Sequence, residues 1–554
     1  MSKEWSAGTG FSRGGGIFAP WLEAGADLSA ADAQNQLVPQ ESEPVKERIQ
    51  DFVCLIAVLI AVTSYLWWVT PTHALYVSDS IYYVGSAQSL AQSGGYHCPV
   101  IEGNPATGLY PPLQSIFLSV AWLINPHFPE NQGVIKGLML GIWAVALAGL
   151  FGVLRKGGLG KAIASLLTLS VGTSGVWAYF VIHCFSDILF AAAAFGAISL
   201  WLNPKSGRFE MRLAVSGLLL GLMYLTRIAT FGFLPGVLAA TVVASYRRRT
   251  VKPIFLVGAP VLATMLAWAL APKETSSYTK YFASEAAAYG GSWPWFRHVI
   301  AFCFRQSWDY ANGNHLLQNL SADLPNMLIA IAPGNPTWRI AVESLLSILG
   351  ISFSALCFFG AYHSVRHRAV QAAVATYVLQ VLVWPFPLGF RGLLPLLPLF
   401  ILWARQGSQA MGPFWSRLFA LAGVSYAALS LVSNLAGAPE TRRALDESQM
   451  FAEAEATGDW IRDSIPAEAR IASHLGLPML HIHQRSRHPI KIVLSIASAL
   501  NETTDGFDYA LTSAQYPVGR TIGRGKGPHL QLAWQSPNGT FQVLKVIPPD
   551  RVLP

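Results

Sequence analysis

One carboxylate and two arginines stand out in a very apolar sequence. Asp79 follows the first long apolar run, and no lysine or arginine occurs between Asp51 and Gln132 to neutralise it. Arg227 and Arg391 are isolated cations at the ends of two later apolar runs. A charge near membrane depth is costly and usually faces a cavity or a partner. Such a carboxylate can accept a proton, and a guanidinium can bind a phosphate.

Each of these residues also has a structural interpretation. Asp79 could cap a helix, because Asp is preferred at helix starts and Ser78 precedes it. The two arginines could extend their charged ends to the membrane interface while their stems stay in apolar surroundings. The residues alone leave both interpretations open.

The composition defines the class of protein. The chain has 554 residues, of which 52% are hydrophobic and 12% are charged, and its mean hydropathy is +0.39. Soluble domains carry about 25% charged residues, so the sequence predicts a polytopic α-helical membrane protein in contact with membrane lipids. The formal charge of +8 then reflects basic loops, and we expect no nucleic-acid partner.

Apolar runs predict the membrane spans. The first run is FVCLIAVLIAVTSYLWWV, and a hydrocarbon core of about 30 Å needs roughly 20 apolar residues. By this measure we expect about eleven spans. The later ones lie near 133–154, 162–182, 187–202, 213–226, 228–245, 253–271, 339–361, 369–385, 391–404 and 417–435.

Basic segments orient these spans. YRRRTVK at 246–252 and HSVRHR at 363–368 are two of the basic loops, and the positive-inside rule places such loops in the cytoplasm. The apolar run at 112–124 is too short to span, so it and the amphipathic segment at 80–92 are expected to be helices at the membrane surface. The loops expected outside are 70–132, 183–187, 272–338 and 385–391.

The chain divides into three parts. Residues 1–50 are rich in Gly, Ala, Ser and Gln and are expected to form a disordered cytoplasmic tail. Residues 51–437 hold the spans and the first external loop at 70–132. Residues 438–554 change character, because DWIRDSIPAEARIASHL has helical spacing while FDYALTS and TFQVLKV are typical of strands. They predict a small extracytoplasmic α/β domain.

The possible metal ligands are not grouped convincingly. The five cysteines show no CxxC or other metal spacing. A disulfide among Cys98, Cys184 and Cys303 is possible, because all three are expected on the outer side. His481 and His483 are predicted to share a strand face, for which a solvated strand is favoured over a metal site.

Several motifs, taken in order, resemble the GT-C superfamily of membrane glycosyltransferases. An acidic residue after the first span precedes IYYVGSAQSLAQSGGY and YPPL, as in the first external loop of that superfamily. The closest similarity is to its protein mannosyltransferase-like and aminoarabinose transferase-like branch, and it covers roughly residues 73 to 545. Further matching segments are HCFSDILFAAAAF, LLLGLMYLTR, FRGLLPLLPL and ATGDWIRDSIPAEARIASHLGLPMLHIHQR.

The resemblance implies a sugar donor carried on a polyprenyl phosphate. Attack on the anomeric carbon needs a base for the acceptor's proton, and one carboxylate suffices when configuration inverts. Asp79 is the candidate base. The leaving phosphate needs a cation to hold its charge, and Arg391 is the first candidate because a guanidinium binds phosphate in bidentate fashion. Arg227 and Lys273 are further candidates.

Other residues are candidates for contacts to the acceptor or the sugar. Tyr82 and Tyr110 could line the sugar site, or anchor the chain at the interface. Asp187 stands where many relatives have Glu. Ser80 follows Asp79 where many relatives have a second acid, and Glu102 could supply that carboxylate instead. No cofactor is expected, and a divalent metal stays an open alternative.

A rival function is a polytopic transporter or lipid flippase without transferase activity. Transporters tend to show internal repeats and polar groups deep in their spans, whereas this chain shows no evident repeat. The acceptor is expected to be a glycan, a lipid or a protein. The expected location is a bacterial cytoplasmic membrane, with the active site and the C-terminus outside; a secretory-pathway membrane stays open.

Overall fold

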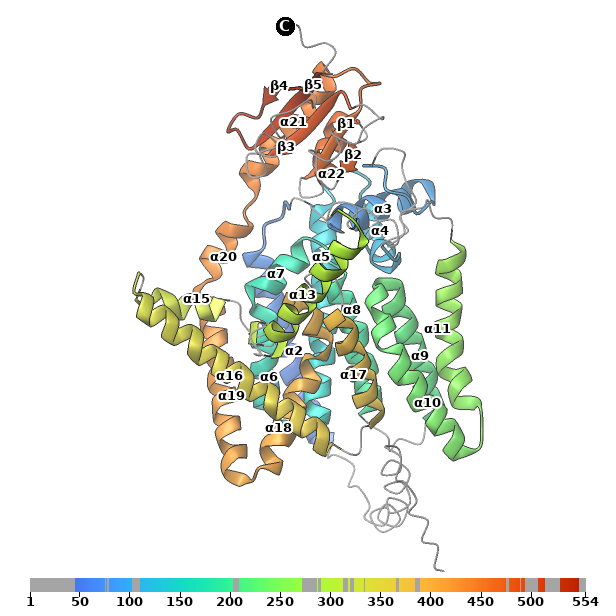
Figure 1. The fold of residues 1–554 in the computed structure, drawn as a ribbon, viewed down its shortest axis with the longest axis vertical. Helices are drawn as coiled ribbons and strands as arrows, with labels where there is room; N and C mark the ends of the chain where they lie inside the picture. The colour runs from blue at the N-terminus through green and yellow to red at the C-terminus, as the bar shows by residue number, and fades with distance from the viewer. Residues whose placement is uncertain are drawn as a thin grey trace, which may run out of the picture. The chain divides into compact units, whose positions relative to one another are not determined.

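A computed structural model gives the fold of a large part of the chain (Figure 1). By contact density it divides into two compact units, residues 1–54 and 55–554. The second unit holds both the later helices and a small sheet. The residues described are 45–74, 76, 79–101, 110–202, 209–271, 286, 290–311, 317–318, 323–332, 334–364, 368–383, 389–474, 478–488, 490–493, 507–513 and 529–547.

Helices dominate, as the sequence predicts. Those of the expected membrane part are α2 (Val45–Val69), α3 (Asp79–Ser93), α4 (Leu113–Ile124), α5 (Gln132–Lys156), α6 (Lys161–Thr173), α7 (Gly175–Ile182), α8 (Asp187–Trp201), α9 (Phe209–Thr226), η1 (Ile228–Gly232), α10 (Leu234–Arg248), α11 (Lys252–Leu270), α13 (Ser292–Ala311), α15 (Asp323–Ala330), α16 (Pro336–His363), α17 (Arg368–Val383), η3 (Gly389–Leu396), α18 (Leu397–Ala410) and α19 (Pro413–Ala436). Each run expected to span, and each expected surface segment, contains a helix.

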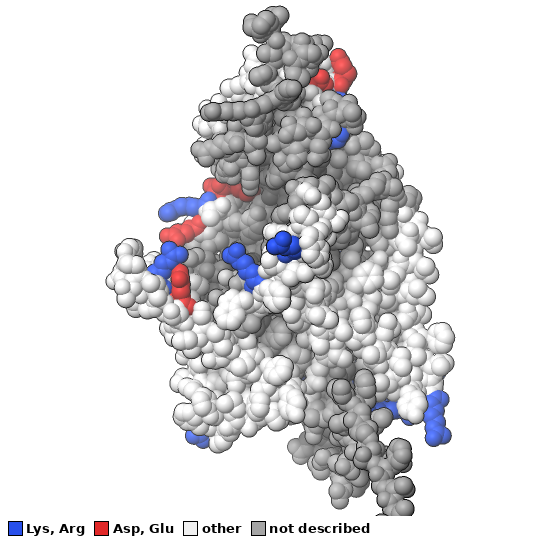
Figure 2. Space-filling view, in the orientation of Figure 1, with Lys and Arg blue, Asp and Glu red and all other residues white. Residues whose placement is uncertain are grey.

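Six of these helices are long and apolar enough to cross a membrane within the described part of the chain. They are α2, α5, α9, α11, α16 and α19, and α6 with α7 makes a seventh if the pair, bent by 56°, is one span. Large apolar side chains such as Phe255, Phe358 and Leu421 are exposed, and much of the visible described surface carries no charge (Figure 2). The chain is therefore a multi-pass membrane protein, while the total of about eleven spans stays a prediction.

Small residues let helices α16 and α18 pack closely. Gly360 of α16 faces the backbone of Trp403 in α18, and Gly407 of α18 faces the backbone of Leu356. A side chain at either glycine would collide with the opposite backbone. Close approach at small residues is the usual way in which helices associate in a bilayer, where no hydrophobic force drives them together.

The C-terminal part forms a five-stranded mixed sheet in the order β2-β1-β3-β5-β4. Strands β2, β1 and β3 are parallel, and β3, β5 and β4 are antiparallel. Helix α21 packs on β5, and α21 and α22 pack on each other (Figure 1). The elements are α20 (Ala438–Leu445), α21 (Ser448–Ser464), β1 (Ile471–His474), α22 (Met479–Ser486), β2 (Ile490–Val493), β3 (Tyr509–Ser513), β4 (His529–Gln535) and β5 (Phe541–Ile547).

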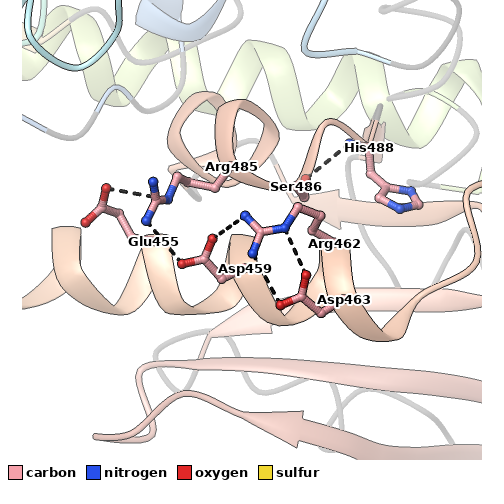
Figure 3. A network of polar contacts seen from close by, with 7 residues as sticks. All are labelled: Glu455, Asp459, Arg462, Asp463, Arg485, Ser486 and His488. Atoms are coloured by element: carbon pink, nitrogen blue, oxygen red, sulfur yellow. Dashed lines mark hydrogen bonds and ion pairs between the residues drawn. The ribbon is translucent and has the colours of Figure 1, made fainter.

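Ion pairs connect α21 to α22 (Figure 3). Arg485 of α22 contacts Asp459 at 3.2 Å and Glu455 at 3.7 Å. Arg462 of α21 contacts the same Asp459 at 2.7 Å and Asp463 at 2.9 Å. Since both arginines are about half exposed, with 47% of each side chain accessible, water and salt screen these pairs, and they orient the helices more than they stabilise them.

The part of the first external loop between α3 and α4 is attached to this sheet. The backbone N–H of Ile490 in β2 donates to the carbonyl of Val100 at 3.1 Å, and Ile101 forms a parallel bridge with Ile490. The amide of Gln484 in α22 donates to Gln88 of α3 at 2.7 Å. The first external loop therefore contributes a short extension to the edge of the C-terminal sheet.

Three details differ from the sequence predictions. His481 and His483 lie on helix α22 and not on a strand, so residues two positions apart point to different sides and the shared face is wrong. All five cysteines are free, which excludes the suggested disulfide among Cys98, Cys184 and Cys303. Helix α2 begins at Val45, within the segment 1–50 expected to be a tail, and residues 1–44 lie outside the described part.

Candidate active site

Asp79 is the first residue of helix α3 and is partly buried. Lys136 fixes the preceding chain, because its buried ammonium donates to the carbonyls of Trp67 and Thr70 at the end of α2. The Asp79 carboxylate accepts a hydrogen bond from the Tyr110 hydroxyl, with 3.0 Å between Oδ1 and the phenol oxygen. This carboxylate thus binds a side chain from across the loop instead of capping its own helix.

Three tyrosine rings form one wall beside Asp79. The rings of Tyr82 and Tyr110 stack, with centroids 4.4 Å apart and an angle of 22° between planes. Tyr83 meets Tyr110 edge-on at 5.5 Å. Offset stacking and edge-to-face contact are the preferred arrangements of aromatic rings, so the wall is a packed unit.

Asp187 and Arg227 form an ion pair next to this wall. Asp187 is the first residue of α8, and Arg227 follows the last residue of α9. Their Oδ2 and Nη1 atoms are 2.5 Å apart, and their side chains are 6% and 18% exposed. The contact is close, but no N–H points at Oδ2 in hydrogen-bond geometry, so we describe it as a buried ion pair.

A hydrogen bond joins the tyrosine wall to this pair. The hydroxyl of Tyr83 lies 2.8 Å from Ser186 Oγ, and Ser186 precedes Asp187. Asp79 and Tyr83 both lie within electrostatic range of Arg227. The structure therefore brings together five of the predicted site residues, from helices α3 and α8 and from two connecting segments: Asp79, Tyr82, Tyr110, Asp187 and Arg227.

Arg391 lies on an element that is adjacent to this group. It is partly buried in η3, which packs on α8. Tyr377 of α17 donates to the carbonyl of Gly392 at 2.9 Å and lies within electrostatic range of Arg227. Among the residues whose placement is described, no carboxylate pairs with Arg391. Its guanidinium differs in this respect from that of Arg227.

Lys273 and Glu102 lie outside the described residues. No group of three or more His, Cys, Asp or Glu side chains that could hold a metal ion occurs in the described part of the chain.

Sequence reasoning missed two residues that support the site. Tyr96 donates its hydroxyl to the Tyr110 carbonyl at 2.7 Å, and it ends the segment of the first loop that resembles the GT-C motif. The position of Tyr96 in that motif could have identified it as a residue that supports the site. Tyr377 lies in the apolar run at 369–385, which holds no charged residue, so no signal in the sequence distinguishes it from an interface tyrosine.

No protein-family model matches the chain, and no curated protein matches it in sequence. Solved structures do match it over most of its length. ArnT from Cupriavidus metallidurans, bound to undecaprenyl phosphate, has a TM-score of 0.49 and 12% sequence identity, and the match covers 89% of this chain and 97% of that one.

Two further matches are to proteins described as transferases. The archaeal oligosaccharyltransferase AglB from Archaeoglobus fulgidus, in complex with an inhibitory peptide and a dolichol-phosphate, has a TM-score of 0.46 and 11% identity, covering 90% of this chain and 75% of that one. The mycobacterial arabinofuranosyltransferase AftD has a TM-score of 0.42 and 13% identity, covering 89% and 40%.

Proposed function

We propose that this protein is a membrane glycosyltransferase that moves a sugar from a polyprenyl-phosphate-linked donor to an acceptor outside the cytoplasm. One observation carries the proposal. A loop carboxylate, Asp79, lies with a tyrosine wall and the Asp187–Arg227 pair at the adjoining ends of α3, α8 and α9. Transferase chemistry at an anomeric carbon needs a proton acceptor, a surface for the sugar and cations for the phosphate.

The proposed mechanism uses Asp79 as the general base. Its carboxylate takes the proton of the acceptor's nucleophilic group while that group attacks the anomeric carbon. The bond from that carbon to the phosphate oxygen breaks, and the polyprenyl phosphate leaves with the electron pair. A single displacement inverts the configuration at the carbon.

The two arginines have different parts in this proposal. Arg227 already has Asp187 as its counter-ion, so a bound phosphate would share it with that carboxylate. Arg391 has no carboxylate partner among the described residues, so it is the better phosphate ligand, because its bidentate donors stay available. Lys273, and Glu102 at the acceptor, remain further candidates. The lipid tail of the donor would enter from the bilayer, and the acceptor from the outer aqueous side.

The location proposed for the site follows from the basic loops. With the loops at 246–252 and 363–368 in the cytoplasm, the first external loop and the C-terminal sheet lie on the outer side of the membrane. The membrane that we propose is a bacterial cytoplasmic membrane. The acceptor is then a glycan, a lipid or a protein on that side.

The test follows donor consumption by the purified full-length protein in lipid nanodiscs. The unaltered chain is compared with Asp79→Asn against a panel of polyprenyl-phosphate sugars and crude envelope acceptors. We expect consumption of one donor, and a loss of about 10²-fold or more in the variant, in the range typical of general-base catalysis. Asp463→Asn is the matched control, since Asp463 is 64% exposed on α21.

Two outcomes would contradict the proposal. Equal consumption by the unaltered chain and by Asp79→Asn would remove Asp79 as the base. No consumption of any donor by a protein that moves labelled lipid or solute across vesicles would replace the transferase by a transporter or a flippase.

A further inference from the structure

Tyr110 is held on three sides by residues of the first external loop. Its ring stacks on Tyr82 and receives the edge of Tyr83. Its carbonyl accepts a hydrogen bond from the Tyr96 hydroxyl at 2.7 Å. The ring and the backbone are therefore both fixed, and the direction of the hydroxyl at the far end of the ring is fixed with them.

The hydroxyl of Tyr110 is directed at the carboxylate of Asp79. Burial, and next the negative charge of Asp79, raise the pKa of Tyr110 well above its usual value. The phenol consequently keeps its proton and donates it to Asp79 Oδ1. Among the described residues, Tyr110 is the only one whose side chain forms a hydrogen bond with Asp79.

We infer that Tyr110 is a positioning residue for Asp79: it holds Oδ1 of the carboxylate and so presents Oδ2 to the acceptor. The inference rests on the proposed function of Asp79 and goes further, because it assigns Tyr110 to the base instead of to the sugar. A carboxylate that accepts a bond at one oxygen no longer rotates freely about its Cβ–Cγ bond. Fixing a catalytic group in this way removes an entropic cost from the reaction.

The neighbouring tyrosines support this division of roles. Tyr82 lies with its ring against the face of Tyr110, and the hydroxyl of Tyr83 is engaged with Ser186. Of the three rings in the wall, Tyr110 alone donates to Asp79 in the described structure. Removing its oxygen should therefore disturb the base without removing the wall.

The experiment measures kcat and donor KM for Tyr110→Phe in the full-length protein, with the polyprenyl-phosphate sugar that the unaltered chain consumes. We expect kcat to fall about 10- to 100-fold, the size of effect that misplacement of a catalytic group produces, with donor KM unchanged. Tyr110→4-aminophenylalanine restores a donor on the same ring and should recover most of kcat. Tyr246→Phe is the control, because Tyr246 is 83% exposed and far along the chain on α10.

A double-variant comparison separates positioning from other roles. In the Asp79→Asn background, Tyr110→Phe should cause little further loss, because the group that it positions is already absent. The thermal midpoint of each variant reports whether the protein is folded. If Tyr110→Phe proves unfolded, the kcat of the 4-aminophenylalanine variant decides, and a value near that of Asp79→Asn would overturn the inference.

The results distinguish this inference from the proposed function. An unchanged kcat in Tyr110→Phe, beside a loss in Asp79→Asn, would overturn the positioning role and leave the transferase proposal intact. A raised donor KM with unchanged kcat would make Tyr110 a sugar contact instead. Absence of donor consumption by the unaltered chain would remove both.

Discussion

At the scale of single residues, the two arginines of the candidate site differ in their partners, and this difference is testable. Arg227→Met would leave Asp187 buried without a counter-ion, and breaking a buried pair in this way costs about 3 kcal/mol or more. Arg391→Met would leave no carboxylate unpaired among the described residues. We therefore expect thermal unfolding in nanodiscs to start well below the unaltered midpoint for Arg227→Met and close to it for Arg391→Met.

The same pair offers its own control. Asp187→Asn combined with Arg227→Met removes both charges, so the double variant should unfold at a higher temperature than Arg227→Met alone. Equal midpoints for the two single arginine variants would mean that the Asp187–Arg227 contact contributes little to stability.

Glu453 on α21 makes a second prediction at this scale. Its side chain is 2% exposed and accepts hydrogen bonds from the Ser536 hydroxyl and from the Thr540 N–H at 3.0 Å, at the turn between β4 and β5. Burial raises the pKa of Glu453, but the hydrogen bonds from Ser536, Thr540 and Asn538 together hold it below the usual value of 4.5.

The sign of the pH dependence follows from that shift. Below pH 4.5 the unfolded chain takes up a proton that the folded chain does not, so the stability due to Glu453 is present above pH 4.5 and is lost as the pH falls further. Glu453→Gln should lower the free energy of unfolding at pH 7 by about 1–3 kcal/mol. Glu453→Gln should also lose less stability below pH 4.5 than the unaltered chain, which thermal unfolding at a series of pH values measures. The same loss of stability below pH 4.5 in both proteins would contradict the role of Glu453.

Single residues were predictable where a local pattern marks them. Asp79 begins the surface helix expected from the amphipathic pattern at 80–92, and Arg227 directly follows the apolar run that forms α9, so the sequence pattern marks both positions. The pairing of Asp187 with Arg227 was not predictable, since it depends on how α8 and α9 pack. The bond from Tyr110 to Asp79 crosses a loop whose path no periodicity describes.

At the scale of elements, the edge of the C-terminal sheet holds the first external loop. The Ile490 N–H donates to the carbonyl of Val100, whose side chain is fully buried. Ile490→Pro removes the donor and leaves that carbonyl without its partner, at a cost of about 1–3 kcal/mol. Since Val100 and Tyr110 belong to one loop, we expect donor consumption to fall as well, by about tenfold if the site is displaced.

The control for this prediction is Ile490→Val, which keeps the N–H and much of the buried side chain. Donor consumption and the thermal midpoint are measured for both variants. Full activity in a folded Ile490→Pro protein would show that the β2 edge does not position the loop.

Element type was predictable where the apolar pattern is long, and less so where it is short. Helices such as α5 and α16 follow runs of more than twenty residues, for which the pattern is unambiguous. The segment around His481 and His483 is short and follows a true strand, β1. Alternating polar and apolar residues over so few positions fit both the period of a strand and that of a helix. The packing of α22 on α21 favours the helix.

At the scale of the whole molecule, the C-terminal elements and the first external loop belong to one compact unit. His183, at the end of α7, lies 3.7 Å from Glu447, which precedes α21. His481 of α22 packs against Tyr76 and Phe128 of the first external loop, with ring centroids 5.9 and 4.9 Å apart. The sheet is thus part of the structure that supports the site, which composition alone could not show.

The histidine in this junction predicts how the molecule responds to acid. His481 is buried, and burial, with a smaller effect of His73, lowers the pKa of His481 from 6.5 to about 3. Between these values the unfolded chain binds a proton that the folded chain does not, so the free energy of unfolding falls as the pH drops below 6.5, by about 1.4 kcal/mol per pH unit. Burial also lowers the pKa of His483 on the same helix, so both histidines contribute between pH 6.5 and 5, whereas Glu453 contributes only below pH 4.5.

We therefore expect the thermal midpoint in nanodiscs to fall between pH 6.5 and 5, and His481→Phe to make this fall less steep, with the remainder due to His483. Phenylalanine keeps the aromatic contacts with Tyr76 and Phe128 but has no proton to gain. His127→Gln, at an exposed position, should leave the slope unchanged. If His481→Phe loses stability with the same slope as the unaltered chain, another group governs the acid response, and the junction between α22 and the first external loop does not depend on a neutral histidine.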